Sequence, residues 1–183
     1  MRIKYILTLT ATFTVGLVFW WYYSASDAEN IVPYKSDRDR EAILEIFSQD
    51  WEWLVAQSPE TYSAAYRLDY KAPSPRPQDI GKMNIAVYRL DGNTVGFVTY
   101  HKVSFYKGFI LFLAVKREYR GRGIAHELAR YAIEQLRKRG SCIVELYTRA
   151  DNYGAQRIYE RIGFENVGIE GDFIKYHYQT SAC

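Results

Sequence analysis

The sequence predicts an α/β fold, because strand and helix patterns alternate along most of the chain. The clearest strand is Phe109–Val115, a continuous apolar run of aromatic, aliphatic and β-branched residues that suits a strand buried on both faces. A glycine-rich basic loop follows it. From Ile124 onward, apolar residues recur at helical spacing until Gly140, a residue type that commonly ends helices.

The part before this strand begins with a short strand near Ile31–Tyr34. A helix starts at Ser36, since Asp39 three residues later completes a capping box. Its apolar stripe consists of Ile43, Phe47, Trp51 and Leu54. The sequence Ser58-Pro59-Glu60 then starts a second helix that runs to about Leu68, and a proline-rich loop over 71–77 leads back to the sheet.

Five further strands and one further helix complete the domain. Strand patterns over Asn84–Leu90 and Val95–Val103 bracket the turn sequence Asp91–Thr94 and predict a hairpin. The remaining elements are a strand (Cys142–Tyr147), a helix that begins at Asn152, and two short strands (Glu165–Ile169 and Phe173–Gln179). The expected order is β-αα-βββ-α-β-α-ββ.

The basic loop after Val115 is suited to a pyrophosphate. A loop between a central strand and a helix directs free backbone N–H groups and the positive end of the helix dipole toward one spot. Gly121 and Gly123 allow close backbone approach, while Arg120 and Arg122 add charge. His126 stands where a dinucleotide fingerprint needs its third glycine, and the nucleoside-triphosphate loop motif is missing from the sequence.

The loop resembles the acyl-CoA-binding motif of the GNAT superfamily of N-acetyltransferases, Gln/Arg-x-x-Gly-x-Gly/Ala. Its fixed positions here are Arg120, Gly123 and Ala125. The segment Asn152–Phe164 matches the superfamily's second motif, Asn-x-x-Ala-x-x-x-Tyr-x-x-x-Gly-Phe, at all five fixed positions. Asn152, Ala155 and Tyr159 share one helix face through their spacing. The element order is also that of the superfamily, which implies helices on both faces of a twisted mixed sheet.

The resemblance implies an N-acetyltransferase that moves an acetyl group from acetyl-CoA, as co-substrate, to a primary amine by direct attack, without a covalent enzyme intermediate. Tyr159 matches the general acid that protonates the coenzyme A sulfur. The implied cofactor-binding residues lie on the buried strand, in the loop and on the second-motif helix: Leu113, Ala114, Val115, Arg120, Gly121, Arg122, Gly123, Ile124, Ala125, Asn152, Ala155 and Tyr159.

At the position where the family carries its general base, this sequence has a different residue type. The resemblance implies a glutamate five residues before Asn152, a position that Tyr147 holds here. Glu145, two residues earlier on the same strand face, is the candidate base. The alternative is that Glu145 has no catalytic role and is a charged residue at a strand edge, exposed to solvent. His101 and Glu118 are further candidates. A water chain with no dedicated base is another alternative, especially for an α-amine of pKa near 8.

The acceptor stays open among a protein α-amine, a lysine, a polyamine and a small amine, and so does the length of the acyl chain. A competing interpretation is a non-catalytic module that binds acyl-CoA or a protein on the same scaffold.

The N-terminal segment, residues 1–29, predicts a membrane anchor ahead of a GNAT domain over 30–183. Residues 5–23 carry no charge and end in Trp and Tyr residues, which suits a single span. Arg2 and Lys4 predict an N-inside orientation, which conflicts with a cytoplasmic supply of acetyl-CoA, so the side of the membrane stays open. A cleaved signal peptide followed by export is the alternative.

Charge and cysteine content limit which partners and metals the sequence predicts. The chain has 24 basic and 21 acidic residues, and two of each belong to the N-terminal segment, so the domain has only a small basic excess and no nucleic-acid partner is expected. Cys142 and Cys183 predict neither a disulfide framework nor a metal pattern. The sequence from His126 begins like a zinc-protease helix but has Arg130 where the second histidine is needed, so no metal is expected.

Overall fold

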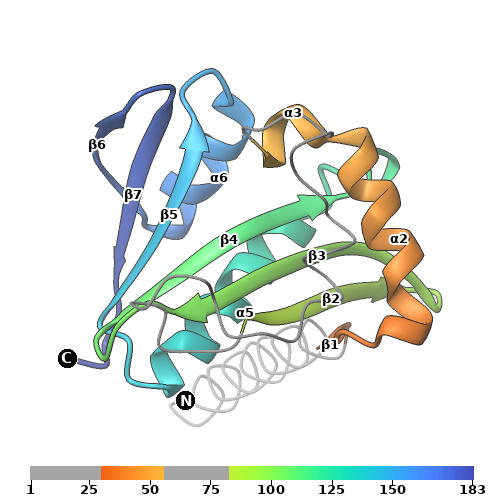
Figure 1. The fold of residues 1–183 in the computed structure, drawn as a ribbon, viewed down its shortest axis with the longest axis horizontal. Helices are drawn as coiled ribbons and strands as arrows, with labels where there is room; N and C mark the ends of the chain where they lie inside the picture. Colours follow the sequence, from red (N-terminus) through yellow and green to blue (C-terminus); the bar gives the residue numbers. More distant parts are fainter. Residues whose placement is uncertain (1–29, 56–82) are drawn as a thin grey trace, which may run out of the picture.

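The computed structural model describes residues 30–55 and 83–183, and in this part of the chain one mixed sheet lies between two helical layers (Figure 1). The sheet has seven strands in the order β1-β2-β3-β4-β5-β7-β6. Its strands are β1 (Ile31–Pro33), β2 (Asn84–Leu90), β3 (Asn93–Lys102), β4 (Lys107–Val115), β5 (Ile143–Arg149), β6 (Glu165–Glu170) and β7 (Phe173–Gln179). The helices are α2 (Ser36–Gln49), α3 (Trp51–Leu54), the 3-10 turn η1 (Arg117–Tyr119), α5 (Ile124–Lys138) and α6 (Tyr153–Ile162).

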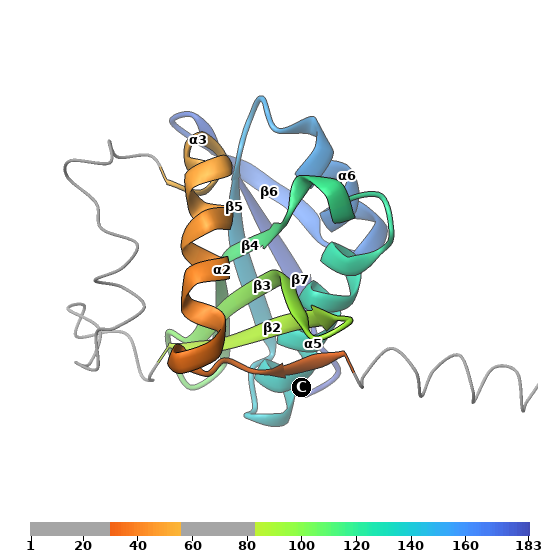
Figure 2. The same ribbon diagram turned by 90° about the vertical axis from the view of Figure 1, so that its right-hand side faces the viewer.

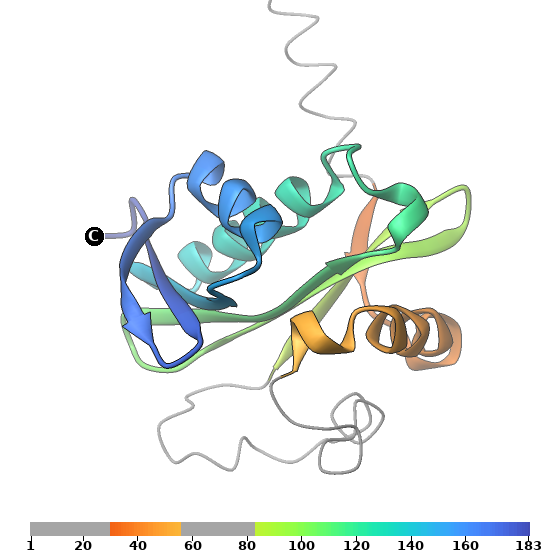
Figure 3. The ribbon, with the colours of Figure 1, turned by 90° about the horizontal axis from the view of Figure 1, so that it is seen from above.

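The predicted fold class and the order of the described elements are confirmed. Helices α2 and α3 cover one face of the sheet and α5 and α6 cover the other (Figures 2 and 3). The expected helix from Ser58, the proline-rich loop over 71–77 and the predicted membrane segment over 5–23 lie outside the described residues.

Each face of the sheet has its own apolar core. On one face, Leu128 and Leu136 of α5 are fully buried against the sheet. On the other, Ile43 and Phe47 of α2 are buried, and the Phe47 ring meets that of Phe112 edge to face at 5.1 Å. Burial of one such side chain contributes about 1.5–3 kcal/mol, so the two apolar stripes fix the helices to opposite faces.

Strands β4 and β5 diverge at their carboxyl ends. They pair in parallel only from Lys107–Ile143 to Phe109–Glu145, while β4 stays paired with β3 up to Val115 and β5 with β7 up to Arg149. Figure 1 shows the two strands moving apart toward α3 and α6. The ends of β4 and β5 therefore present facing edges that no other described strand occupies.

The start of α2 differs in detail from the predicted capping box. The N-cap is Lys35, whose backbone N–H donates to Asp39 Oδ2 at 2.8 Å. Thr94 Oγ1 of β3 donates to the other oxygen of this buried carboxylate at 2.8 Å, and Arg38 pairs with it at 2.9 Å. Burial alone would raise the pKa of Asp39, but these hydrogen bonds hold it below its usual value. Asp39 thus joins α2 to the sheet.

Cys142 and Cys183 form a disulfide, so the expectation of no disulfide is wrong. The two residues are 41 apart in sequence, but their Cα atoms are 5.4 Å apart. The cause is strand pairing, because Ile143 at the start of β5 lies opposite Gln179 at the end of β7. The bond ties the C-terminal residue to the sheet.

We expect Gly108→Ala to lower the free energy of unfolding by about 1–3 kcal/mol. A Cβ at this position would lie 2.8 Å from both terminal methyl carbons of Leu136, which is fully buried and has little room to move. Urea denaturation measures the loss. Gly154→Ala on the exposed side of α6 is the matched control, because its Cβ would meet nothing nearer than 3.7 Å and alanine favours helix. Equal stability of Gly108→Ala and the wild type would contradict the packing described here.

Candidate active site

The loop after β4 has the backbone shape that the sequence predicts for a pyrophosphate cradle. Gly121 and Gly123 adopt φ of 77° and 84°, values that favour glycine, and Gly123 is the N-cap of α5. A Cβ on Gly121 would meet no atom within 4 Å, so its outer side is open. The loop and the first turn of a 15-residue helix therefore fit an anionic ligand.

The two arginines of the loop differ in what their side chains contact. The Arg120 guanidinium pairs with the buried carboxylate of Asp50 at the end of α2, and its Nε donates to the Val115 carbonyl at 2.9 Å. Arg120 thus connects the loop to the end of α2 and has a structural contact of its own. Arg122 is exposed, with its guanidinium 5.1 Å from the centre of the Tyr119 ring, so its charge is open to a ligand. Sequence reasoning gave both arginines the same role.

The β4 segment from Leu113 to Val115 lies in the diverging part of the sheet. Its residues pair with Val98, Phe97 and Gly96 of β3 and face no residue of β5. Next to it the register slips by one residue, because Thr99 pairs with Phe112 and Tyr100 with Ile110. The extra residue on β4 is Leu111, and no signal in the sequence predicted this bulge.

The residues of the second motif lie on α6 and its N-cap. Asn152 Oδ1 accepts the backbone N–H of Ala155 at 3.1 Å, as an N-cap does. Tyr159 is buried, with its ring 5.7 Å from that of Phe164 and 6.0 Å from that of Tyr176. This burial raises the pKa of Tyr159 above the ordinary tyrosine value, so the phenol stays protonated at neutral pH.

Glu145 is buried beside two lysines and a histidine, on the face of β5 opposite the core that contains Tyr159. Its Oε1 lies 2.9 Å from Lys107 Nζ, 3.7 Å from Lys175 Nζ and 2.5 Å from His177 Nε2. Burial alone would raise the pKa of Glu145, but the hydrogen bond from Lys107 and the nearby charges hold it below its usual value. The carboxylate is stable in its ionised form and is therefore a weak proton acceptor.

Tyr147 donates a hydrogen bond from its hydroxyl to Glu170 Oε2 of β6 at 3.1 Å. Sequence reasoning missed Glu170, which is 23 residues away and outside both motifs. The two other base candidates lie on other elements, although the Phe109 ring contacts the rings of both His101 and Tyr147. His101 is on β3 with its ring 5.8 Å from that of Phe109, and Glu118 is exposed in η1. Within residues 30–55 and 83–183, no three His, Cys, Asp or Glu side chains are grouped to hold a metal.

The model of the acetyltransferase (GNAT) family matches residues 40–164, which include both motifs and the diverging strands. The chain belongs to this family. The family match favours the catalytic interpretation over the non-catalytic module.

Curated relatives match over a shorter stretch. N-alpha-acetyltransferase 30 of Schizosaccharomyces pombe is 39% identical over 64 residues, 35% of this chain and 43% of the relative. N-alpha-acetyltransferase MAK3 of Arabidopsis thaliana is 42% identical over 64 residues, 35% of this chain and 33% of the relative. The chain thus matches less than half the length of these relatives.

Solved structures share the fold. Ard1 from Thermoplasma volcanium superposes with a TM-score of 0.65 at 23% identity, over 82% of this chain and 96% of that chain. The PaiA N-acetyltransferase from Thermoplasma acidophilum, solved with coenzyme A, has a TM-score of 0.62 at 22% identity, over 82% and 99% of the two chains.

The predicted membrane localisation is contradicted. In the described part of the chain, no helix combines the length and the apolar character that a membrane span requires.

Proposed function

We propose that this chain transfers the acetyl group of acetyl-CoA to the α-amine of a protein or peptide. The observation that carries the proposal is the divergence of β4 and β5 between the two motif regions, with the glycine loop at one end and Tyr159 beside it. The names of the curated relatives support an α-amine as acceptor.

The described residues fit acetyl-CoA because the open outer side of Gly121 and the start of α5 suit its pyrophosphate. The Arg122 guanidinium adds charge there. The free edge of Leu113–Val115 offers backbone groups to the pantetheine arm and to the oxyanion that acyl transfer generates. Asn152 and Ala155 line the other side at the start of α6. When bound, acetyl-CoA supplies an activated thioester.

The acid role falls to Tyr159, whose protonated phenol suits a donor to the departing thiolate. Two roles are open to Glu145. It is the proton acceptor that the sequence predicts, or it is a structural anchor for Lys107, Lys175 and His177. The cations around it favour the anchor.

The proposal is tested by following thiol release from acetyl-CoA with the full chain. The acceptor is a pool of hexapeptides that have free α-amines and contain no lysine. We expect thiol release and N-terminally acetylated peptides by mass spectrometry. The same pool with acetylated N-termini is the control and should release no thiol above background.

Three further acceptors define the substrate class: an N-terminally blocked lysine peptide, a polyamine and a small aryl amine. Faster thiol release with one of these than with the peptide pool would refute the α-amine assignment. Failure of every amine would refute the proposed reaction.

A further inference from the structure

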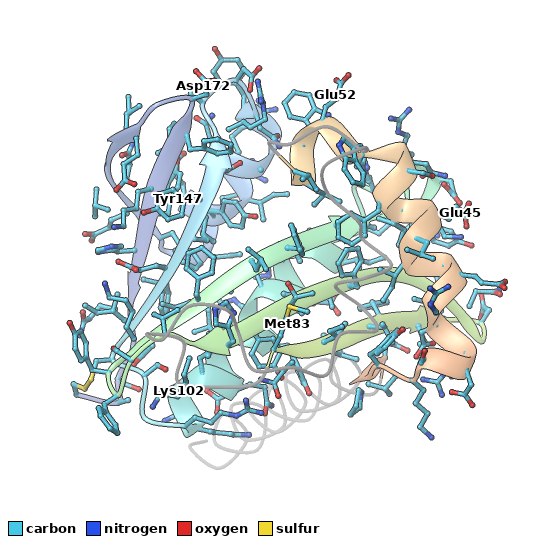
Figure 4. All side chains as sticks on the ribbon, in the orientation of Figure 1. Glu45, Glu52, Met83, Lys102, Tyr147 and Asp172 are labelled. Carbon is cyan, nitrogen blue, oxygen red and sulfur yellow. A yellow bond between two sulfur atoms is a disulfide. The ribbon has the colours of Figure 1, made fainter. Side chains whose placement is uncertain are left out.

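The two faces of β5 carry different chemistry where it leaves β4. Val144 and Leu146 are buried in the same core as Tyr159, on the α5 and α6 side. Glu145 and Tyr147 alternate with them and therefore lie on the opposite face. Figure 4 shows Tyr147 on β5, and its position is two residues beyond the last β4–β5 pair. The diverging strands thus have Tyr159 on one side and Tyr147 on the other.

Tyr147 is held by contacts from three strands. Its ring lies 6.0 Å from the ring of Phe109 on β4, and Lys175 Nζ of β7 lies 5.5 Å from its centre. Its hydroxyl hydrogen bonds to Glu170 of β6. These contacts orient the hydroxyl, and Lys175 also forms a side-chain hydrogen bond with Tyr147. A phenol oxygen has a further lone pair with which it can accept a hydrogen bond from a ligand.

The two carboxylates on this face differ in their exposure and in the groups that surround them. The Glu145 side chain is 8% exposed and has the ammonium groups of Lys107 and Lys175 and the His177 ring around it. The Glu170 side chain is 60% exposed, with Lys175 Nζ at 3.6 Å and the Tyr147 hydroxyl as its contacts on this face. The Glu170 carboxylate therefore contacts both the Tyr147 hydroxyl and bulk water.

We propose that Tyr147 and Glu170 form a proton relay that deprotonates the acceptor ammonium on the face of the sheet opposite Tyr159. This inference rests on the proposed function. One N–H bond of the ammonium breaks as its proton passes to the Tyr147 oxygen, and the Tyr147 O–H proton passes to Glu170 Oε2. The neutral amine then forms the N–C bond, the C–S bond breaks, and Tyr159 protonates the thiolate. Glu170 returns its proton to water.

The relay predicts a distinctive pH dependence, because it lets the enzyme use the protonated amine. An α-ammonium has a pKa near 8, so only about 3% of it is neutral at pH 6.5. For the full chain with the α-amine hexapeptide pool, we expect kcat/KM to stay within about threefold between pH 6.5 and 8. For Glu170→Gln we expect kcat/KM to fall about 30-fold from pH 9 to pH 6.5, following the neutral amine.

The comparison isolates the relay because the other titratable and charged groups that face it, Lys107, Glu145, Lys175 and His177, are unchanged in Glu170→Gln. Tyr147→Phe keeps the ring contacts and should show the same steep profile. The double variant should show no additional loss, as expected for two residues that act in one step. Glu165→Gln on the same strand is the matched control and should keep the wild-type profile.

A Glu170→Gln profile parallel to that of the wild type, with equal fold loss at every pH, would overturn the relay and leave Glu170 a structural role. Additive losses in the double variant would also overturn it. Both outcomes require an active wild-type enzyme, so they are distinct from failure of the proposed function, in which the wild type itself releases no thiol.

Discussion

Tyr159→Phe is expected to lower kcat for acetyl transfer by about 10²-fold or more, with little change in the KM for acetyl-CoA. The substitution removes the hydroxyl that protonates the thiolate and retains the ring that packs against Phe164 and Tyr176. Steady-state thiol release with the peptide pool measures the effect. The expected loss is in the chemical step, since the phenyl ring preserves the packing of α6.

Proton donation from Tyr159 to the thiolate has an energetic cost. A phenol of ordinary pKa near 10 protonates a thiolate of pKa near 8.5 at an expense of about 2 kcal/mol, and burial of Tyr159 increases that expense. Burial also keeps the phenol protonated across the assay range. The profile of kcat should therefore show no ionisation of Tyr159 below pH 9.

Tyr176→Phe supplies the matched control for Tyr159→Phe. Tyr176 is fully buried on β7, and its hydroxyl donates to Glu160 Oε1 at 3.0 Å. Loss of this hydrogen bond should lower the free energy of unfolding by about 1 kcal/mol and leave kcat within a few-fold of the wild type. If both variants lose activity equally, or neither does, Tyr159 is not the general acid.

Glu145→Ala is expected to lower the free energy of unfolding by about 3–5 kcal/mol. The substitution leaves Lys107, Lys175 and His177 around a site that has lost its negative charge. Glu145→Gln keeps the shape and should lose less, because the amide still accepts a hydrogen bond from Lys107. Urea unfolding at pH 7 measures both losses.

The same variants decide between the two roles of Glu145. If it is a structural anchor, kcat of the folded Glu145→Gln protein stays within a few-fold of the wild type although stability falls. A loss of kcat of about 10²-fold or more at unchanged stability would instead identify Glu145 as the base.

The stability loss in Glu145→Gln should depend on pH. Because the folded-state pKa of Glu145 is lowered, its charge stabilises the fold fully above the unfolded pKa of about 4.3. This stabilisation is lost as the pH falls through the folded-state value. The difference between wild type and Glu145→Gln should therefore be largest at neutral pH and shrink below about pH 4. A difference that grows on acidification would contradict the charge assignment.

The described part of the fold was largely predictable, because its elements have strong local patterns. The 84–90 strand agrees residue for residue, and β4 extends its predicted range by only two residues, to Lys107. Alternation and helical periodicity depend on neighbours along the chain, which the sequence contains directly. The capping box at Ser36 failed in detail because Thr94, from a distant strand, shares the Asp39 carboxylate.

The sequence by itself determined the two motif regions. The loop at Gly121 and Gly123 needs φ values that favour glycine, and Asn152 caps its own helix, so both depend on local backbone geometry. These regions were enough to predict the family. The catalytic and binding roles of their residues stay predictions, with the experiments above as their tests.

Only the tertiary structure decided which distant groups meet. Strand order and register bring together residues that are far apart in the sequence. The contacts formed in this way are the Arg120–Asp50 pair, the Tyr147–Glu170 hydrogen bond, the ion pairs of Glu145 and the Cys142–Cys183 bond. A one-residue change of register would turn Glu145 and Tyr147 to the opposite face of β5. No pattern along the chain encodes such contacts, because they depend on how β4, β5, β6 and β7 are arranged side by side.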